Sequence, residues 1–444
     1  MTALMLVILA ALLDDSVNWP SFRGAGASGV ATATPPTTWN ADRKVGPDRN
    51  LRWKTAIPGL SHASPVVWGD RVFVATAIRA DGEAPLKVGL YGSGDSASDD
   101  TEQRWVVDAL DKKTGTIVWE KTAHQGTPRA RRHPKATHAN TTLVTDGKRV
   151  IAFFGSEGLY AYSFQGELLW KTDLGTLDSG PHGTDLQWGH ASSPVIWEDK
   201  LLLQCDQKKG SFLACLSVQD GKELWRADRE AVCRQSWATP TVVQAAGRLQ
   251  VVCNGFPFIV SYEVSTGKEL WRLGSGGDIP VPAPVFSQGL IYVTNAHGSL
   301  APLYAIRPES SGDLSLKEGE SSNAGVAWSE PRNGAYMQTP LVWDDLVYSC
   351  SDRGVLKVYG AKTGRLEYTQ RLESRPIGFT SSPVAAGGRI YFASEEGEVH
   401  VLKAGPRYEL LATNRLGDLT LSSPAISENA LYFRTRHHVI AVGE

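Results

Sequence analysis

Cysteine and methionine are scarce in this sequence, with 5 and 3 residues among 444. No cysteine stands next to another or forms a Cys-x-x-Cys motif, which argues against a structural zinc site and a thioredoxin-like redox centre. A surplus of either charge is also missing, since 45 Lys and Arg face 47 Asp and Glu, for a net charge of -2. This balance argues against binding to nucleic acid through bulk positive charge, and we expect no nucleic-acid partner.

Long hydrophobic runs are lacking as well. A helix that spans a bilayer needs about 20 apolar residues, and no stretch reaches that length. Residues 1–13 (MTALMLVILAALL) form a shorter apolar run that fits the hydrophobic part of a secretory signal, although no Lys or Arg precedes it. The sequence therefore predicts a signal peptide at 1–13, export to the periplasm or cell envelope, and no transmembrane span in the mature chain. An uncleaved anchor or a misassigned start remains the alternative.

Tryptophan, glycine and proline are plentiful instead, with 14, 44 and 24 residues. They belong to a repeat in which Ser or Thr and then Pro precede a short run of alternating apolar residues. Its prolines from Pro194 to Pro424 lie 41 to 56 residues apart. A period in the forties with short strands is typical of β-propellers. The copies are 63–77, 192–205, 238–253, 283–296, 339–351, 381–394 and 422–435, and a weaker one at 140–154 has Thr142 in the place of proline.

A second motif follows the first and ends in tryptophan. Its clearest copy, ALDKKTGTIVW at 109–119, has the pattern Ala-x-Asp-x-x-Thr-Gly-x-x-x-Trp. Gly115 suits a tight turn between two strands because glycine readily adopts positive φ. Trp119 is large enough to pack between neighbouring blades. We interpret the acids beside this motif, such as Asp108 and Asp111, as turn-capping residues and not as catalytic ones.

Eight copies of the first motif predict an all-β fold, an eight-bladed β-propeller. The eighth copy ends at Glu444 without a Trp strand of its own, and residues 50–59, with Trp53 in the Trp position, supply the missing strand. Pairing of this strand with the last blade would close the ring from N- to C-terminus and remove the edge strands. We therefore expect residues 50–444 to be one propeller domain, with 14–49 as an extended segment lying over its surface.

The matched positions Ala109, Asp111, Thr114, Gly115 and Trp119 resemble the tryptophan-docking repeat of the quinoprotein alcohol dehydrogenase-like propellers, the PQQ-like repeat family. The resemblance covers nearly all of the chain after residue 50, and it is specific for fold and weak for function. The opening WPSFRG together with the SSPV copies is similar to exported members from planctomycete-type bacteria.

This resemblance implies two kinds of function. Some members are dehydrogenases that carry pyrroloquinoline quinone (PQQ) with calcium. Others are non-catalytic, such as the periplasmic lipoprotein of the outer-membrane β-barrel assembly machinery. The sequence lacks the adjacent cysteines that cover the cofactor in the dehydrogenases, and it lacks a lipid-anchored cysteine after the signal. The resemblance implies PQQ with calcium as the cofactor, another divalent metal is the alternative, and no cofactor is assigned.

Residues just before each Ser/Thr-Pro are expected to line one mouth of the central channel. Three blades in succession place a histidine there, namely His62, His138 and His190. Three imidazoles that converge on one axis would be able to hold a metal ion. The alternative is that each histidine caps a turn and bonds to the backbone.

A basic stretch, TPRARRHPKATH at 127–138, leads to the same mouth and contains no acid. Fixed cations beside a pocket attract a carboxylate, a phosphate or an acidic sugar, and the alternative is a solvated charged loop. Aromatic and polar residues follow in later blades, and interblade packing is the alternative role for the tryptophans. The candidate ligand-binding residues are Arg129, Arg131, Arg132, His133, Lys135, Trp188, Gln235, Trp237 and Tyr336, with Asp206 as a further member of a polar wall.

The sequence favours a non-catalytic exported scaffold whose channel mouth binds a protein partner or a small anionic ligand. The alternative is a PQQ- or metal-dependent oxidoreductase that uses the three histidines and the basic stretch. A third hypothesis is a polysaccharide-binding or polysaccharide-degrading accessory protein with Trp188, Trp237 and Tyr336 as stacking platforms. No catalytic residue is assigned.

Overall fold

The structure of the protein is a computed structural model that describes residues 17–90, 94–274, 276–297 and 300–444. The predicted signal peptide at 1–13 lies outside these residues. Within the described ranges, no helix has both the length and the apolar character needed to cross a membrane.

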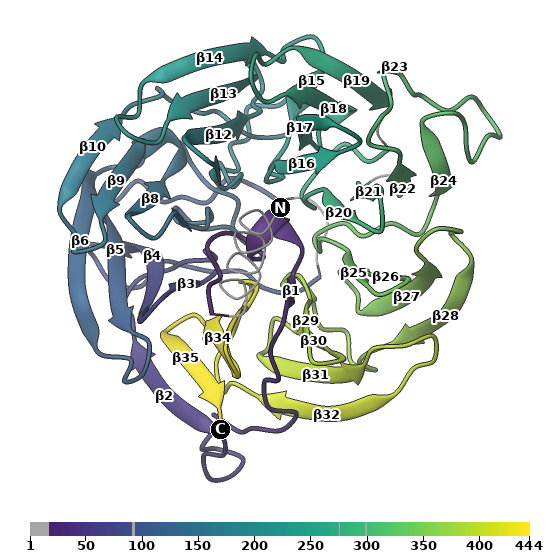
Figure 1. Cartoon of the computed structure of the whole chain (residues 1–444). Helices are drawn as coiled ribbons and strands as arrows, with labels where there is room; N and C mark the ends of the chain where they lie inside the picture. The colour runs from purple at the N-terminus through teal and green to yellow at the C-terminus, as the bar shows by residue number, and fades with distance from the viewer. Residues whose placement is uncertain (1–16, 91–93, 275, 298–299) are drawn as a thin grey trace, which may run out of the picture.

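Eight antiparallel sheets surround a central axis, so the predicted all-β, eight-bladed propeller is confirmed (Figure 1). The first four blades contain β3 (Val66–Trp68), β4 (Arg71–Arg79), β5 (Gln103–Asp111) and β6 (Ile117–Gly126); β7 (Val144–Thr145), β8 (Arg149–Phe153), β9 (Leu159–Ser163) and β10 (Leu168–Thr172); β11 (Val195–Trp197), β12 (Lys200–Cys205), β13 (Phe212–Ser217) and β14 (Glu223–Asp228); and β16 (Thr241–Ala245), β17 (Arg248–Cys253), β18 (Phe256–Glu263) and β19 (Glu269–Gly274). In the fourth blade β15 (Cys233–Gln235) pairs with β18, and β23 (Gly312–Asp313) pairs with β19.

The next three blades contain β20 (Val285–Ser287), β21 (Leu290–Thr294), β22 (Leu303–Ile306) and β24 (Val326–Glu330); β25 (Leu341–Trp343), β26 (Leu346–Cys350), β27 (Val355–Gly360) and β28 (Leu366–Arg371); and β29 (Val384–Ala386), β30 (Arg389–Ala393), β31 (Glu398–Lys403) and β32 (Leu410–Arg415). The eighth contains β33 (Ala425–Ser427), β34 (Ala430–Arg434), β35 (His438–Gly443) and β2 (Leu51–Ala56). Its strand β2 pairs antiparallel with β35, with Lys54 opposite Ile440. The predicted closure of the ring is therefore confirmed.

The tryptophan motif ties each blade to the next. The indole N–H of Trp53 donates to the Lys112 carbonyl at 2.9 Å, and that of Trp119 donates to the Phe164 carbonyl at 3.1 Å. The turn glycine of the next blade lies against the indole: a Cβ built on Gly115 would stand 2.5 Å from Trp53. Gly115 also has a φ of 73°. The motif therefore needs glycine for its backbone conformation and for the close approach of the ring.

Hydroxyl groups join the blades a second time, around the axis. In six pairs of neighbouring blades, a Ser or Thr hydroxyl accepts a hydrogen bond from the backbone N–H at the same position of the preceding blade. The described bonds run from Ser64 to Thr142, Thr142 to Ser193, Ser193 to Thr239, Ala283 to Thr339, Thr339 to Ser382 and Ser382 to Ser423, at 2.9–3.0 Å. We call these seven hydroxyl residues the hydroxyl belt.

The belt corrects one alignment of the repeat. Thr142 bonds as Ser64 and Ser193 do, so it occupies the serine position and not the proline position. The second blade is therefore shifted by one residue from the register that the sequence comparison assumed. Since side chains on an extended chain alternate between two faces, such a shift exchanges the residues that face the channel for those that face away.

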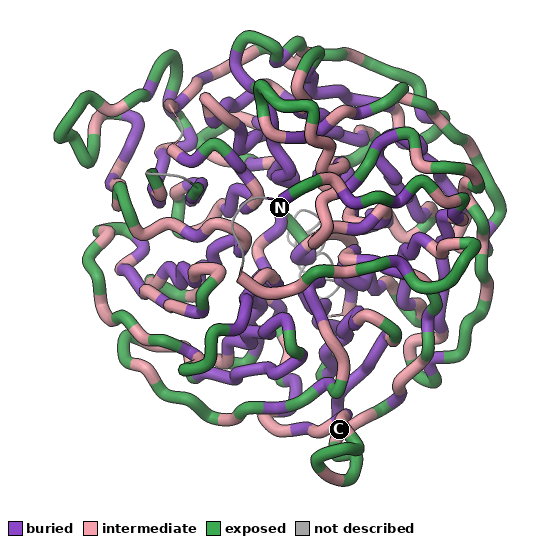
Figure 2. The backbone as a smooth tube through the Cα atoms, turned by 180° about the vertical axis from the view of Figure 1, so that it is seen from behind, coloured by how far each residue is buried: buried purple, intermediate pink, exposed green. Residues whose placement is uncertain are grey.

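Burial follows the distance from the axis. Middle strands such as β5 and β30 are buried along nearly their whole length, whereas outermost strands such as β6 and β14 alternate between exposed and partly buried residues. Figure 2 shows the same contrast as a mainly green and pink rim around purple inner strands. The core thus consists of apolar clusters between adjacent blades, and the polar positions that matter for function are those near the axis.

The segment before β2 begins at the axis and runs outward along the seventh blade (Figure 1). Trp19 exchanges two backbone hydrogen bonds with Val67 on the innermost strand β3. The fully buried Arg23 donates to the carbonyls of Pro340 and Pro383, and β1 (Val30–Ala31) pairs in parallel with β29. Because the neighbouring Phe22 lines the axial cavity, this segment forms one end of that cavity.

The two acids that we interpreted as turn caps separate in the structure. The Asp111 carboxylate accepts the backbone N–H groups of Lys113 and Thr114, so it caps its turn as predicted. Asp108 does not: it is buried in β5, 2% exposed, and one of its oxygens has no hydrogen-bond partner among the described residues. Burial, together with the charge of Glu120, raises the pKa of Asp108 to about 7.

We expect Asp108→Asn to make the stability less dependent on pH. A carboxyl whose pKa is raised on folding stabilises the protein fully below its unfolded pKa, and this contribution is lost as the pH rises through about 7. From pH 4 to pH 8 the wild type should therefore lose roughly 3 kcal/mol of unfolding free energy relative to Asp108→Asn. Urea unfolding at the two pH values measures this difference. Asp111→Asn is the control, and an equal loss in both variants would contradict the assignment to Asp108.

Candidate ligand-binding site on the propeller axis

A cavity of about 730 Å³ lies on the axis, bounded by the connections between blades. The hydroxyl belt lines it, and so do the residues two positions before each of the seven belt residues and before Ala283, which takes the belt position in the fifth blade. These residues are His62, Asn140, Ala191, Trp237, Val281, Met337, Thr380 and Leu421. One residue from every blade thus reaches the cavity, because alternate residues of an extended chain face the same side.

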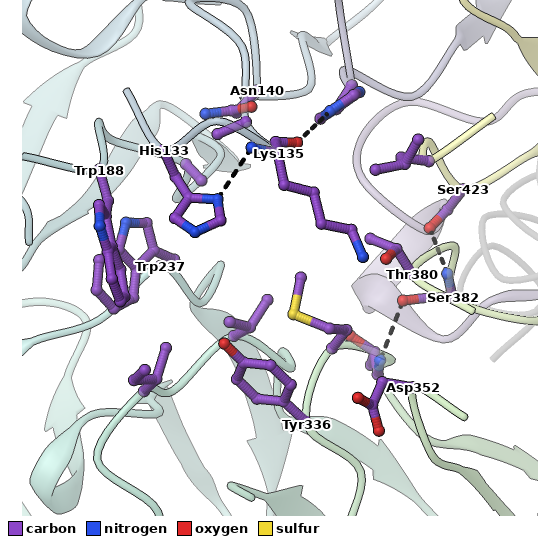
Figure 3. Close-up of a pocket in the computed structure, with 18 of the residues that line it drawn as sticks. His133, Lys135, Asn140, Trp188, Trp237, Tyr336, Asp352, Thr380, Ser382 and Ser423 are labelled. Carbon is purple, nitrogen blue, oxygen red and sulfur yellow. Dashed lines mark hydrogen bonds between the residues drawn. The ribbon is translucent and has the colours of Figure 1, made fainter. Parts of the chain in front are cut away.

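The two sides of the cavity differ in chemistry (Figure 3). Trp188 and Trp237 lie together on one side, with ring centroids 5.7 Å apart. Thr380, Ser382 and Ser423 lie on the opposite side. The Lys135 side chain extends between the two sides into the open space. The cavity therefore offers an apolar ring surface, a hydroxyl surface and a positive charge.

Lys135 is held in place by its own backbone and by a distant acid. Its N–H donates to His133 Nδ1 at 3.0 Å, and its carbonyl lies 2.8 Å from His62 Nε2. Its ammonium lies 2.5 Å from Glu395 Oε1 and donates to the Gly89 carbonyl at 3.0 Å. An ammonium has three N–H donors, and these two described contacts account for two of them.

The aromatic side is equally well supported. The indole N–H groups of Trp188 and Trp237 donate to the carbonyls of Gly94 and Gly189, at 3.2 and 2.7 Å. His133 meets Trp188 edge to face, with ring centroids 5.0 Å apart. Burial and the charge of Lys135 lower the pKa of His133 to about 4, so it is neutral at pH 7. Tyr336 lines the cavity as well, with its ring 5.3 Å from that of His297.

The structure separates the predicted basic residues into two groups. His133 and Lys135 line the cavity, but Arg129, Arg131 and Arg132 do not. Arg129 pairs with Asp173 at 2.9 Å and Arg131 with Asp100 at 3.6 Å. Arg132 is fully buried and pairs with Asp99 at 2.6 Å. The acids come from elsewhere in the chain, so the stretch that looked unpaired in the sequence is largely neutralised.

The predicted polar wall also changes. Trp237 faces the cavity, but Gln235 bridges two connections, since it accepts the His182 N–H and donates to the Asp278 carbonyl. Asp206 is fully buried in an ion pair with Arg229, with a shortest distance of 2.7 Å. Asp206 and Gln235 therefore hold the blades together and do not meet a ligand in the cavity.

The three histidines proposed as metal ligands are not brought together. His62 lines the cavity, and its Nε2 is within hydrogen-bond distance of the Lys135 carbonyl. His190 Nε2 lies 3.0 Å from the Ser192 carbonyl, and His138 Nε2 lies 3.4 Å from Asp99. His138 and His190 stand four and three residues before their belt hydroxyls, whereas His62 stands two before, so they are out of register with it. Burial lowers the pKa of His62 and His190 to about 4, in keeping with neutral, backbone-bonded rings.

Among the described residues, the group whose three potential metal-ligand atoms do lie within 4.8 Å of one another is a different one, Glu373, Glu398 and His400. Arg375 already pairs with both glutamates, at 3.2 and 2.5 Å, and Arg415 pairs with Glu398 at 3.0 Å. The guanidinium groups thus neutralise the carboxylates that a metal ion would need.

Sequence reasoning missed the acid and the segment that complete the site. Glu395 comes from the seventh blade, and Thr380 Oγ1 donates to it at 2.6 Å. The insertion between β4 and β5 also reaches the cavity, through Gly89, Leu90 and Gly94. We call its described residues, 80–90 and 94–102, the mouth segment. The period-two spacing before each Ser/Thr-Pro was a usable signal for Thr380, but no local pattern marked Glu395 or Gly89.

Residues 46–215 and 208–306 match the profile of a protein family described as "Outer membrane protein assembly factor BamB". The match extends over more than half of the chain and coincides with the tryptophan-docked blades. The chain belongs to this PQQ-like β-propeller family. A tetrathionate hydrolase from Acidithiobacillus ferrooxidans is 23% identical to this PQQ-like propeller over 304 residues, which are 64% of this chain and 53% of that protein. This chain therefore spans about half the length of that relative.

Solved structures share the fold. The quinohemoprotein alcohol dehydrogenase from Comamonas testosteroni superposes with a TM-score of 0.65 at 12% identity, over 97% of this chain and 82% of that one. BamB from Moraxella catarrhalis superposes with a TM-score of 0.54 at 16% identity, over 83% of this chain and 100% of that one. At such identities the likeness shows the fold alone.

The cofactor of the quinoprotein branch fits this PQQ-like propeller only in part. PQQ is a flat ring system with carboxylates, which suits the tryptophan side and Lys135. Calcium requires six to eight oxygen ligands, usually with several carboxylates. Asp352 is the acid among the described lining residues, and the nearby Glu395 is engaged by Lys135. The five cysteines are buried and unpaired, and none lines the cavity. The described residues therefore do not fit a calcium-PQQ centre, and we derive no redox step.

Proposed function

We propose that this PQQ-like propeller is a non-catalytic binding protein of the cell envelope whose axial cavity takes a small ring-bearing anion. The observation that carries the proposal is Lys135, whose ammonium projects into a 730 Å³ cavity opposite the Trp188–Trp237 surface (Figure 3). A cation in a partly buried cavity attracts an anion more strongly than one in water. The aromatic surface adds stacking for a ring.

The envelope location rests on the family description, which names an outer-membrane assembly factor. The relative named tetrathionate hydrolase acts, by its name, on a small dianion, and this supports an anionic ligand. The oxidoreductase alternative is weaker, because calcium sites usually use several carboxylates and Asp352 is the one acid among the described residues that line the cavity.

Calorimetric titration of the full chain with PQQ, with and without calcium, tests the proposal. PQQ serves as a probe that joins a flat ring to carboxylates. We expect saturable one-to-one binding that does not require calcium. Binding only with calcium would overturn the non-catalytic assignment in favour of a quinoprotein. No binding at high micromolar PQQ would contradict the small-ligand proposal and leave the protein-binding role that the family description favours.

Lys135→Met should weaken PQQ binding by about tenfold or more, because it removes the charge that pairs with the ligand carboxylate. Lys113→Met is the control, since Lys113 is exposed on the turn of the first blade. Calorimetry measures both affinities, and a melting curve shows that each variant is folded. Equal affinities in the two variants would show that Lys135 is not the anion-binding group.

A further inference from the structure

Glu395 occupies the position that a ligand carboxylate would take on Lys135. Its Oε1 lies 2.5 Å from Lys135 Nζ and accepts the Thr380 hydroxyl at 2.6 Å, and its Oε2 accepts the Gly89 N–H at 2.7 Å. The side chain is 2% exposed, and a Cβ built on Gly378 would stand 2.3 Å from Oε1. Three donors and a close backbone thus form a built carboxylate position, filled by a side chain of the protein itself.

The same two side chains pin the mouth segment. Gly89 donates its N–H to Glu395 and accepts the Lys135 ammonium through its carbonyl, at 2.7 and 3.0 Å. These residues belong to three different blades or connections: Gly89 to the first blade, Lys135 to the connection before the second, and Glu395 to the seventh. Gly89 and Leu90 line the cavity, so the pinned residues form part of its wall.

Three other described contacts of the mouth segment do not involve the Lys135–Glu395 pair. Lys87 donates its N–H to the Pro134 carbonyl, Arg436 donates to the Ala84 carbonyl, and Asp99 pairs with Arg132. These contacts hold the segment on both sides of Gly89. Breaking the pair would therefore release a short stretch around Gly89 and leave the rest of the segment attached.

We propose that Glu395 is an internal competitor for the ligand, and that a ring-bearing carboxylate which takes its place on Lys135 unpins the mouth segment at Gly89. The inference rests on the proposed function and adds its regulation and its ligand chemistry. A second carboxylate beside Lys135 repels Glu395 strongly in a partly buried cavity. Ligand binding and release of Gly89 are thereby coupled, since both draw on the same donor and acceptor atoms.

Glu395→Gln separates the two roles of the carboxylate. The amide keeps the shape but has one acceptor oxygen where the carboxylate has two, so it cannot satisfy Lys135, Thr380 and Gly89 together. It also carries no charge against the ligand. We expect the variant to bind PQQ without calcium roughly tenfold more tightly than the wild type. We expect faster amide hydrogen exchange in the peptide 84–90 before ligand is added.

In the wild type, the same peptide should exchange faster when PQQ is added. Glu396→Gln is the matched control, because the neighbouring Glu396 contacts Arg375 at 3.4 Å on the surface and should change neither measurement. A second titration uses glucuronate in place of PQQ. Comparison of the two affinities shows whether the cavity prefers a sugar acid or an aromatic acid.

The outcomes separate this inference from the proposed function. If neither probe binds the wild type or Glu395→Gln, the proposed function itself fails. If PQQ or glucuronate binds both proteins with the same affinity, Glu395 does not compete and the inference is overturned. Tighter binding to Glu395→Gln with unchanged exchange of 84–90 in every state would also overturn it, because the mouth segment would then not respond to the pair.

Discussion

Asp206→Ala is expected to lower the free energy of unfolding by about 3–5 kcal/mol. Asp206 and Arg229 are both fully buried, and two guanidinium nitrogens of Arg229 meet the two carboxylate oxygens at 2.7 and 2.9 Å. Arg229 also donates to the Tyr262 hydroxyl at 2.9 Å, which joins the third blade to the fourth. Removing the carboxylate leaves a buried guanidinium without its counter-charge, which costs far more than the loss of a surface pair.

Equilibrium unfolding in urea measures this cost. The control is Asp220→Ala, on the exposed turn of the same blade, where Asp220 pairs with Lys222 in solvent. Surface substitutions of this kind change stability by about 0.5 kcal/mol or less. Similar losses in the two variants would show that the buried pair does not hold the third and fourth blades together.

Trp53→Ala should cost about 3–5 kcal/mol, through loss of a large buried side chain and the space it leaves. Trp53 is 7% exposed, and its ring packs between Tyr432 of the eighth blade and Gly115 of the first. Strand β2 is far in sequence from the other three strands of the eighth blade. The substitution therefore acts on the strand through which the N-terminal part of the chain closes the ring.

Trp53→Phe is the informative companion to this variant. It keeps a ring in the interface but removes the indole N–H that donates to the Lys112 carbonyl, so it should cost less than Trp53→Ala. Urea unfolding, followed by the far-ultraviolet circular dichroism of the sheets, compares the two. If Trp53→Ala unfolds at the same urea concentration as the wild type, ring closure does not depend on the Trp53 contact.

The channel-lining positions show how much of the axial cavity could be predicted from the repeat. Seven copies of the Ser/Thr or Ala-Pro motif align correctly, and in each the residue two positions before the Ser, Thr or Ala reaches the cavity. The second copy has no proline, and its register was assigned one residue away from the true one. That shift kept His138 among the three residues expected to line the channel, although it stands four residues before Thr142 and packs against Trp105. His190 fails without a register error, because it stands three residues before Ser193 and neighbouring residues of an extended chain face opposite sides.

The basic stretch shows what a local pattern cannot reveal. Arg131 and Arg132 have no acid within the stretch 127–138, yet Asp100 and Asp99 of the mouth segment reach them. Lys135 differs from them because its partner, Glu395, leaves the ammonium on the cavity side. Whether a cation is free for a ligand depends on acids that lie tens to hundreds of residues away in sequence.

The sequence by itself determined the all-β class, the eight blades and the closing strand around Trp53. These follow from local spacing: alternating apolar residues, a glycine turn and a tryptophan recur in each blade, and a blade buries its faces only against its neighbours. Only the tertiary structure decided which cations face the axial cavity, which histidines do not, and that Glu395 fills the position on Lys135. Those outcomes depend on charge pairs between distant segments, and such pairs form only when the blades come together around one axis.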